Sequence, residues 1–248
     1  PTAPGTPTAS HRILRTGNPH RRRLRAVHDV LVIGAGSAGC VLASRLSERP
    51  GTSVLLVEAG TRSRKLEIGI PAAFSKLFGS TVDWGYRTTP QNSLDGRRLV
   101  YPRGRVVGGS ASINAMMVLR GHRLDHAAWP AGWRWDDVAP VYARSAERFP
   151  STQPASPSPL TRAFIDAAER TLALERRPDL NDPDNDGVGL TPLSVVGGKR
   201  HSVVAGYLTP ALGRSNLELR TGSLVRRLVF EGGRVVGVEL RRGRELEI

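Results

Sequence analysis

The chain has 248 residues, of which 39% are hydrophobic and 23% are charged, so it can bury the core of one large domain or two small ones. Its single cysteine, Cys40, excludes a disulfide framework and a zinc site built from thiolates. No apolar run reaches the roughly 18 residues of a membrane-spanning helix, and residues 1–28 lack the apolar stretch of a secretory signal. We therefore expect a soluble protein of the cytoplasm.

The formal charge of +14 raises the question of a nucleic-acid partner. The excess is nearly all arginine and is thinly spread, which favours a coding bias over a binding surface, and we expect no nucleic-acid partner. One dense cluster, at residues 21–25, leaves phosphate binding as the alternative. It lies within residues 1–27, a lead rich in Pro, Thr and Arg with no apolar period, which predicts a disordered basic segment.

The first predicted element is a buried strand over Asp29–Ile33, which is short, apolar and β-branched. A glycine-rich bend, Gly34–Gly39, follows it, and apolar residues then repeat at helical spacing as far as Leu46. Ser53–Glu58 predicts a second buried strand. Strand, bend, helix and strand within about 30 residues make a βαβ unit.

The spacing Gly34-x-Gly36-x-x-Gly39 indicates a dinucleotide site. Gly34 allows a tight turn, Gly36 allows the backbone to approach a pyrophosphate, and Gly39 allows the helix to pack closely on the strand. The helix N-terminus offers free N–H groups to the phosphates. Glu58, about 20 residues further on, is placed to accept hydrogen bonds from a ribose and disfavours a 2′-phosphate.

The middle of the chain alternates between loops and helical segments. Residues 61–100 are loop-rich, and a glycine-rich turn opens the stretch 104–120. Residues 133–142 predict the start of a helix, and the Pro- and Ser-rich stretch 150–159 predicts a linker. The next helix is expected to bury one apolar face, made of Leu160, Phe164, Ala167, Ala168 and Leu172.

From Leu217 onward the pattern predicts strands joined by tight turns. Residues 225–230 and 235–240 flank the turn Glu231–Gly233 and form a hairpin signal. A third strand is predicted at Glu245–Ile248. Because the sequence stops in a strand that needs a neighbour, the pattern favours a truncated domain.

Several motifs lie along the chain in a recognisable order. The first are the segment His28–Ser47 and the Val-Glu-Ala-Gly that ends at Gly60. Further stretches follow: Asp83–Gln91, Pro102–Asn114, Gly132–Val138 and Arg200–Pro210. In order and spacing these motifs resemble the glucose–methanol–choline (GMC) oxidoreductases, and the resemblance covers nearly all of residues 28–248.

This resemblance implies an α/β fold: a Rossmann-like FAD-binding fold with a parallel sheet and a β-meander, plus part of an α+β substrate-binding domain, truncated. The implied domains are the first part of the FAD-binding domain at 28–149, a partial substrate-binding domain at 150–215, and a return to the FAD-binding domain at 216–248.

The resemblance also implies FAD as the cofactor and a set of residues that contact it. They are Gly34, Gly36, Ser37, Ala38, Gly39, Glu58, Val106, Gly108, Gly109, Ser110, Asn114, Ala115, Met116, Met117 and Val225. Ile113 stands where some members carry a histidine joined covalently to the flavin, so we expect FAD to be held non-covalently. No metal site is expected.

The implied activity is oxidation of a small alcohol by hydride transfer to the flavin, with an electron acceptor that the sequence leaves open. Such a reaction needs a base beside the hydroxyl, which members of the family take from a C-terminal half that has no counterpart here. We therefore name no catalytic residue and expect the isolated chain to be inactive. Three alternatives stay open: an NAD-dependent dehydrogenase, a non-catalytic FAD-binding remnant, and a subunit completed by a separate second half.

Overall fold

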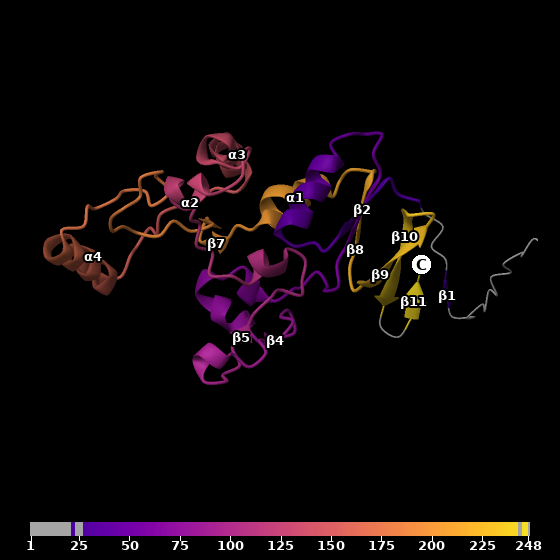
Figure 1. Ribbon diagram of the computed structural model, residues 1–248, viewed down its shortest axis with the longest axis horizontal. Coiled ribbons are helices and arrows are strands. Elements are labelled where there is room, and N and C mark those ends of the chain that lie inside the picture. Colours follow the sequence, from indigo (N-terminus) through magenta and orange to yellow (C-terminus); the bar gives the residue numbers. More distant parts are fainter. Residues whose placement is uncertain (1–20, 23–26, 243–244, 248) are drawn as a thin grey trace, which may run out of the picture. The chain divides into compact units, whose positions relative to one another are not determined.

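The computed structural model describes residues 21–22, 27–242 and 245–247 (Figure 1). The chain divides into two compact units. The larger comprises residues 27–224, and the smaller comprises residues 1–26 together with 225–248.

Three parallel strands form the sheet of the larger unit, in the order β2, β3, β8 (Figure 1). They span Val30–Ile33, Val54–Val57 and Leu217–Arg220. The central strand β3 is buried along its whole length, as its unbroken apolar run requires. Helix α1, Ser37–Leu46, connects β2 to β3. The predicted βαβ unit is therefore confirmed, and β8 extends it on the other side of β3.

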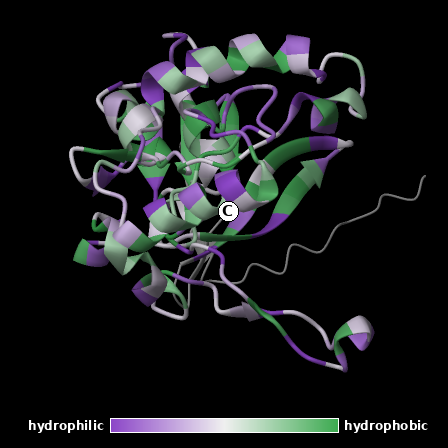
Figure 2. Ribbon diagram, turned by 90° about the vertical axis from the view of Figure 1, so that its left-hand side faces the viewer, coloured by the Kyte–Doolittle hydropathy of each residue, from purple (hydrophilic) through white to green (hydrophobic). Residues whose placement is uncertain are grey.

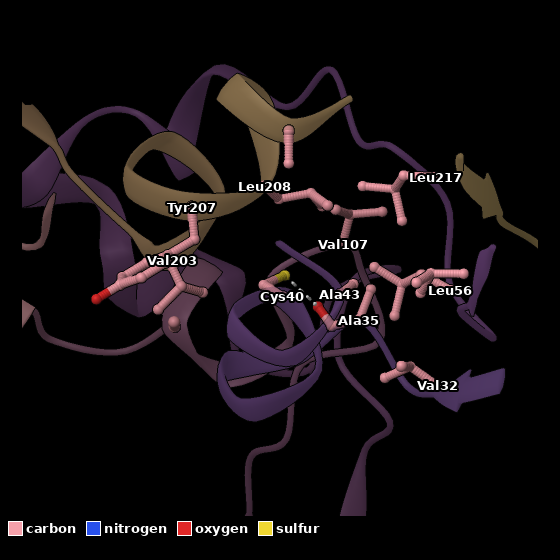
Figure 3. Packing of buried hydrophobic residues seen from close by; sticks show 13 residues of the cluster. Val32, Ala35, Cys40, Ala43, Leu56, Val107, Val203, Tyr207, Leu208 and Leu217 are labelled. Atoms are coloured by element: carbon pink, nitrogen blue, oxygen red, sulfur yellow. Dashed lines mark hydrogen bonds between the residues drawn. The ribbon is translucent and has the colours of Figure 1, made fainter. Parts of the chain in front are cut away.

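The main core lies between the sheet, α1 and the helical segment that precedes β8. That segment consists of a π-helix, η5 (Val204–Leu208), continued by the short α5 (Thr209–Ala211), and α1 packs against both η5 and β3. Figure 3 shows side chains from all three parts meeting there, and the fully buried members include Leu56, Leu208 and Cys40. Burial raises the pKa of the Cys40 thiol to about 12, so this cysteine is an inert core residue.

A second, smaller cluster holds the loop-rich region that follows β3. Its buried members are Leu77, Val82, Val106 and Ile113. The region contains short elements only: η1 (Leu66–Ile68), η2 (Pro71–Leu77), β4 (Tyr86–Arg87), η3 (Asn92–Leu94), β5 (Val100–Tyr101) and η4 (Gly109–Ser112). Strands β4 and β5 form an antiparallel pair.

Three α-helices follow: α2 (Arg123–Ala127), α3 (Trp135–Arg148) and α4 (Pro159–Leu172). The predicted helix start at 133–142 is confirmed, and α3 runs on to Arg148. Hydrophilic and hydrophobic residues alternate along the helices of the ribbon (Figure 2). No helix in the described part of the chain is long and apolar enough to cross a membrane.

The predicted buried face of α4 is wrong in its main members. Leu160, Phe164 and Leu172 are 79%, 67% and 66% exposed, whereas Ile165 and Ala168 are buried. These two pack against Val188, which covers only one side of the helix. A helical apolar period shows that a face can be buried, but it does not show which neighbour is there to cover it.

The predicted linker at 150–159 is held by backbone hydrogen bonds near its start. The backbone groups of Thr152 and Leu193 exchange two hydrogen bonds of 2.8 Å. The Ser158 hydroxyl, at the other end, accepts a hydrogen bond from the backbone N–H of Thr161 and caps α4. A short antiparallel hairpin, β6 (Val195–Val196) with β7 (Lys199–Arg200), follows.

The smaller unit is a four-stranded sheet in the order β1, β11, β10, β9. Its strands are Arg21–Arg22, Glu245–Glu247, Arg234–Arg242 and Leu224–Glu231. The predicted turn between β9 and β10 is confirmed, and Gly232 and Gly233 both have positive φ there.

The last strand, β11, has a neighbour on each side, because it lies between β10 and β1. Arg21 and Arg22 are therefore strand residues rather than disordered chain, since backbone pairing at a sheet edge requires no apolar side chain. The rest of the predicted disordered lead, 1–20 and 23–26, lies outside the described residues, as do residues 243–244 and 248.

Candidate functional site: a double glycine bend

The bend after β2 closes tightly on the first turn of α1. Gly34 has φ +92°, a conformation that L side chains rarely adopt, and its N–H donates to the Val57 carbonyl at 2.7 Å. A Cβ built on Gly39 would lie 1.9 Å from the Gly34 carbonyl oxygen. No side chain larger than hydrogen fits between these backbones, so the structure places Gly34 and Gly39 where the motif predicts a turn and close packing.

The N-terminus of α1 presents free donors at this bend. Its N-cap, Gly36, has no side chain to cap the helix, and the first turn carries no acidic residue. The first intrahelical hydrogen bond runs from the Cys40 N–H to the Gly36 carbonyl at 2.9 Å, so the amides of Ser37 and Ala38 precede it. Both residues are exposed. Uncapped N–H groups and the helix dipole together favour an anionic group.

A second glycine turn lies directly against the first. Gly108 and Gly109 have φ values of +93° and +53°, and the Gly108 N–H donates to the Ala35 carbonyl at 2.6 Å. A Cβ on Gly109 would lie 2.8 Å from the Cα of Gly36. By contrast, a Cβ on Gly36 would meet no protein atom within 4 Å. Two glycine motifs far apart in the sequence thus form one surface, which is open at Gly36.

Glu58 holds this double bend to the end of β3. Its side chain is buried, with Oε2 accepting from the Ala35 N–H at 2.9 Å and Oε1 accepting from the Gly60 N–H at 2.8 Å. Sequence reasoning assigns Glu58 to a ribose and misses this clamp. It also misses the close approach at Gly60, where a Cβ would lie 2.1 Å from the Arg105 carbonyl oxygen.

The predicted stretch 114–117 forms an irregular turn beyond the second glycine pair. Met116 is buried and has φ +63°, which is unusual for a residue with a side chain. Asn114 is exposed, and its Oδ1 accepts from the Met116 N–H at 3.1 Å. Met117 is 62% exposed. The turn therefore offers Asn114 and Met117 to a ligand and uses Met116 to anchor itself.

The remaining predicted contacts divide between the two units. Val106 is buried in the second core cluster, and the Ser110 hydroxyl accepts from the Gly104 N–H at 3.2 Å. Ala115 is half-buried. Val225 belongs to β9 in the smaller unit, so its predicted contact with the adenine end of the cofactor stays a prediction.

A cavity of about 600 Å³ opens beyond the carboxyl end of β3. Three cationic side chains, Arg64, Lys65 and Arg105, contribute to its wall, and no carboxylate does. The lining also includes the hydroxyl residues Thr61 and Thr81. Its positive wall and its position beside Glu58 and Gly60 suit a phosphate-bearing ligand. Crevices at the carboxyl ends of parallel strands are where α/β folds bind their ligands.

Asp83 holds the base of the β4–β5 hairpin beside this cavity. Its buried carboxylate accepts from the backbone N–H groups of Gly79 at 2.8 Å, Arg103 at 2.9 Å and Gly85 at 3.1 Å. Desolvation raises the pKa of the Asp83 carboxyl, but these donors outweigh it, and the net effect holds the pKa below the ordinary value of 3.8.

A depressed pKa makes the hairpin sensitive to acid. The contribution of the Asp83 carboxylate to the free energy of unfolding is fully present above pH 3.8. It is lost as the pH falls through the lower pKa that this carboxyl has in the folded state. We expect Asp83→Asn to reduce the free energy of unfolding at neutral pH. We also expect that free energy to fall less steeply in this variant as the pH drops below 3.8, as measured by urea unfolding along a pH series.

The control is Asp184→Asn, at an exposed ion pair with Arg123, which should leave the pH dependence below 3.8 unchanged. An unchanged pH dependence in Asp83→Asn would contradict the role of Asp83.

The described histidines all have structural partners. His126 is buried among Trp129, Trp135 and Tyr142, and its Nε2 lies 3.1 Å from the Arg120 carbonyl oxygen. The Nε2 of His201 lies 3.0 Å from the Arg148 carbonyl oxygen, the His122 ring accepts from the Leu124 N–H, and His28 lies 3.5 Å from Glu218. Two further histidines, His11 and His20, lie outside the described residues.

No group of three or more potential metal ligands occurs in the part of the chain that the structure describes.

Taken together, the βαβ unit, the uncapped helix start at a double glycine bend, and a carboxylate at the end of the second strand define a dinucleotide-binding protein of the Rossmann-like class. The model of the GMC oxidoreductase family matches residues 28–247. The chain belongs to this family, and the predicted family and fold class are confirmed.

Known relatives agree with this assignment. The chain is 42% identical over 232 residues to an uncharacterized GMC-type oxidoreductase of Mycobacterium tuberculosis, a match covering 85% of this chain and 44% of the relative. It is 41% identical over 238 residues to the mitochondrial choline dehydrogenase of Mus musculus, covering 86% of this chain and 40% of the relative. The chain thus spans less than half the length of these curated relatives.

Solved structures show the same fold. Pyridoxine 4-oxidase from Mesorbium loti superposes with a TM-score of 0.83 at 37% identity, over 89% of this chain and 47% of that chain. An FAD-dependent oxidoreductase from Chaetomium thermophilum superposes with a TM-score of 0.79 at 25% identity, over 89% of this chain and 43% of that chain. The family and these neighbours confirm FAD as the predicted cofactor.

Proposed function

We propose that this chain forms the FAD-binding part of an oxidoreductase that acts on the CH–OH group of a small alcohol. The observation that carries the proposal is the open surface at Gly36, where the uncapped start of α1 meets the second glycine turn. The named relatives support the substrate class, because choline and pyridoxine both carry hydroxyl groups. A cytoplasmic location stays a prediction.

The residues present fit FAD. The N–H groups of Ser37 and Ala38 would hold the pyrophosphate, Glu58 would accept from the ribose with the lone pairs that Ala35 and Gly60 leave free, and the turn ending at Met117 would contact the flavin. Bound FAD supplies the acceptor for the hydride of the alcohol.

Ile113 supports non-covalent attachment of the cofactor. Its aliphatic side chain is 1% exposed and packs in the cluster with Leu77, Val82 and Val106, so it provides no nucleophile for a bond to the flavin. The protein part of the chemistry is therefore to bind, orient and shield the cofactor.

The proton acceptor is the part of the reaction for which the described residues offer no candidate. The four described histidines are engaged in the structural contacts given above. We propose that the base comes from the portion of the full-length enzymes that this chain does not match, and that this chain alone does not turn over alcohols.

The first test is flavin binding by the purified protein. We expect visible flavin absorbance to co-elute with the protein, and we expect denaturation to release FAD into the supernatant, because attachment is non-covalent. Adding NADH in excess should not displace the flavin. A colourless protein that binds NADH would contradict the proposal and favour the NAD-dependent dehydrogenase.

A further inference from the structure

Arg200 lies at the end of the short β6–β7 hairpin and is only 9% exposed. Its backbone N–H donates to the Gly69 carbonyl at 3.1 Å, so the backbone that carries the guanidinium is held in place. Burial of an arginine at this level normally requires a carboxylate partner. The hydrogen bonds of Arg200 go to carbonyl oxygens instead.

The guanidinium joins two segments that lie far from Arg200 in the sequence. Its Nε donates to the Ile68 carbonyl at 2.8 Å in η1, and its Nη1 donates to the Ala111 carbonyl at 3.1 Å in η4. Nη1 also donates to Asn114 Oδ1 at 2.6 Å, and Nη2 donates to the Asn114 carbonyl at 2.8 Å. Both oxygens of Asn114 are therefore fixed by one side chain.

Asn114 in turn supports the unusual backbone of Met116. Asn114 Oδ1 accepts from the Met116 N–H, while the Met116 carbonyl accepts from the Ser194 N–H at 2.8 Å. A positive φ at a residue with a side chain costs free energy and persists only where its surroundings impose it. Here the surroundings include Asn114 Oδ1, which accepts from both the Met116 N–H and the Arg200 guanidinium.

The charge on Arg200 survives this burial. Desolvation lowers the pKa of the guanidinium to about 10, which still leaves it protonated at neutral pH. Each of its bonds to a carbonyl is therefore charge-assisted, and such bonds are stronger and shorter than neutral ones. A neutral side chain of similar length would leave these carbonyl groups without their donor.

We propose that Arg200 is a positioning residue of the cofactor site: it sets the conformation of the turn from Ala111 to Met117, through Asn114, and thereby the fit of this turn to the flavin. The inference rests on the proposed function, because it assigns a role within the same site. It concerns the flavin end, whereas the glycine bend at Gly36 concerns the pyrophosphate.

The test is a double-substitution cycle read out by FAD binding to the intact protein. We expect Arg200→Met to weaken the affinity for FAD by about 10- to 100-fold and to change the circular dichroism of the bound flavin. Asn114→Ala should have a similar effect. Because Arg200 acts through Asn114, the two losses of affinity should not add. The double variant should bind FAD with about the affinity of whichever single variant binds it less tightly.

Arg200→Lys is expected to recover part of the affinity, since an ammonium keeps the charge and loses the fork that also reaches Ile68. Arg214→Met is the matched control. Arg214 is a half-buried guanidinium that donates to Ser47 Oγ at 2.8 Å and to the Ser44 carbonyl, away from the turn. Its replacement should lower the unfolding temperature and leave the flavin dichroism unchanged.

Fully additive losses in the cycle would overturn the inference, as would normal FAD affinity and dichroism in Arg200→Met. Failure of the unsubstituted protein to bind FAD is a different result: it would overturn the proposed function and this inference with it. If Arg200→Met does not fold, the cycle is run with Arg200→Lys and Asn114→Ala. Losses of FAD affinity that do not add support the inference, and fully additive losses overturn it.

Discussion

Gly36→Ala is expected to abolish FAD binding while leaving the fold nearly intact. The added methyl group would meet no protein atom within 4 Å, and φ at Gly36 is −76°, which alanine adopts without strain. Alanine is a poorer N-cap than glycine, which costs about 1 kcal/mol at most. In the bound state the methyl group would occupy space that the pyrophosphate needs, so we expect the affinity to fall at least about 100-fold, roughly 3 kcal/mol. Flavin fluorescence titration and thermal unfolding measure the two effects.

Two other glycines calibrate this experiment. Gly51→Ala also places its methyl group in open space, but in the exposed turn after α1, and should change neither property. In Gly39→Ala the methyl group would collide with the Gly34 carbonyl, so stability itself should fall by about 1–3 kcal/mol. If Gly36→Ala binds FAD as tightly as Gly51→Ala does, the pyrophosphate does not pass Gly36.

Glu58→Ala is expected to cost both stability and FAD. The substitution leaves the N–H groups of Ala35 and Gly60 without their acceptor in a buried place, and each such loss costs about 1–3 kcal/mol. We expect a total loss on the order of 2–6 kcal/mol in the free energy of unfolding, measured with urea. We also expect loss of FAD binding, because the bend is no longer held.

Glu58→Gln should be intermediate, since its amide oxygen replaces one acceptor while its NH₂ group faces the other donor. Glu48→Ala is the control, because Glu48 forms an exposed ion pair with Arg45 and should contribute less than about 1 kcal/mol. Equal stability of the Glu58→Ala and Glu48→Ala proteins would show that the clamp is not what holds the bend.

The elements closest to the glycine motif were predictable from the sequence, because their signals are local. A β-branched apolar run, a bend with glycine at Gly34 and Gly39, and a second apolar run specify the βαβ unit by period and turn chemistry alone. The position of Glu58 follows from the same spacing. Its bonds to Ala35 and Gly60 do not, since they depend on how two strand ends meet in space.

Features that depend on distant neighbours escaped prediction. The apolar face of α4 was predicted from its period, yet Phe164 is exposed because Val188 covers only the side of Ile165. Arg200 opens one of the stretches that resemble the family, but its buried position could not be predicted, since only tertiary structure brings its guanidinium against η1 and the turn that follows η4. The contact of Gly109 with Gly36 likewise joins two motifs that the chain keeps apart.

A crystal structure of the protein grown with FAD tests the central claim most directly. The account predicts density for the pyrophosphate against the N–H groups of Ser37 and Ala38, above the Cα of Gly36. Flavin nucleotide bound elsewhere, with water alone over the start of α1, would contradict it.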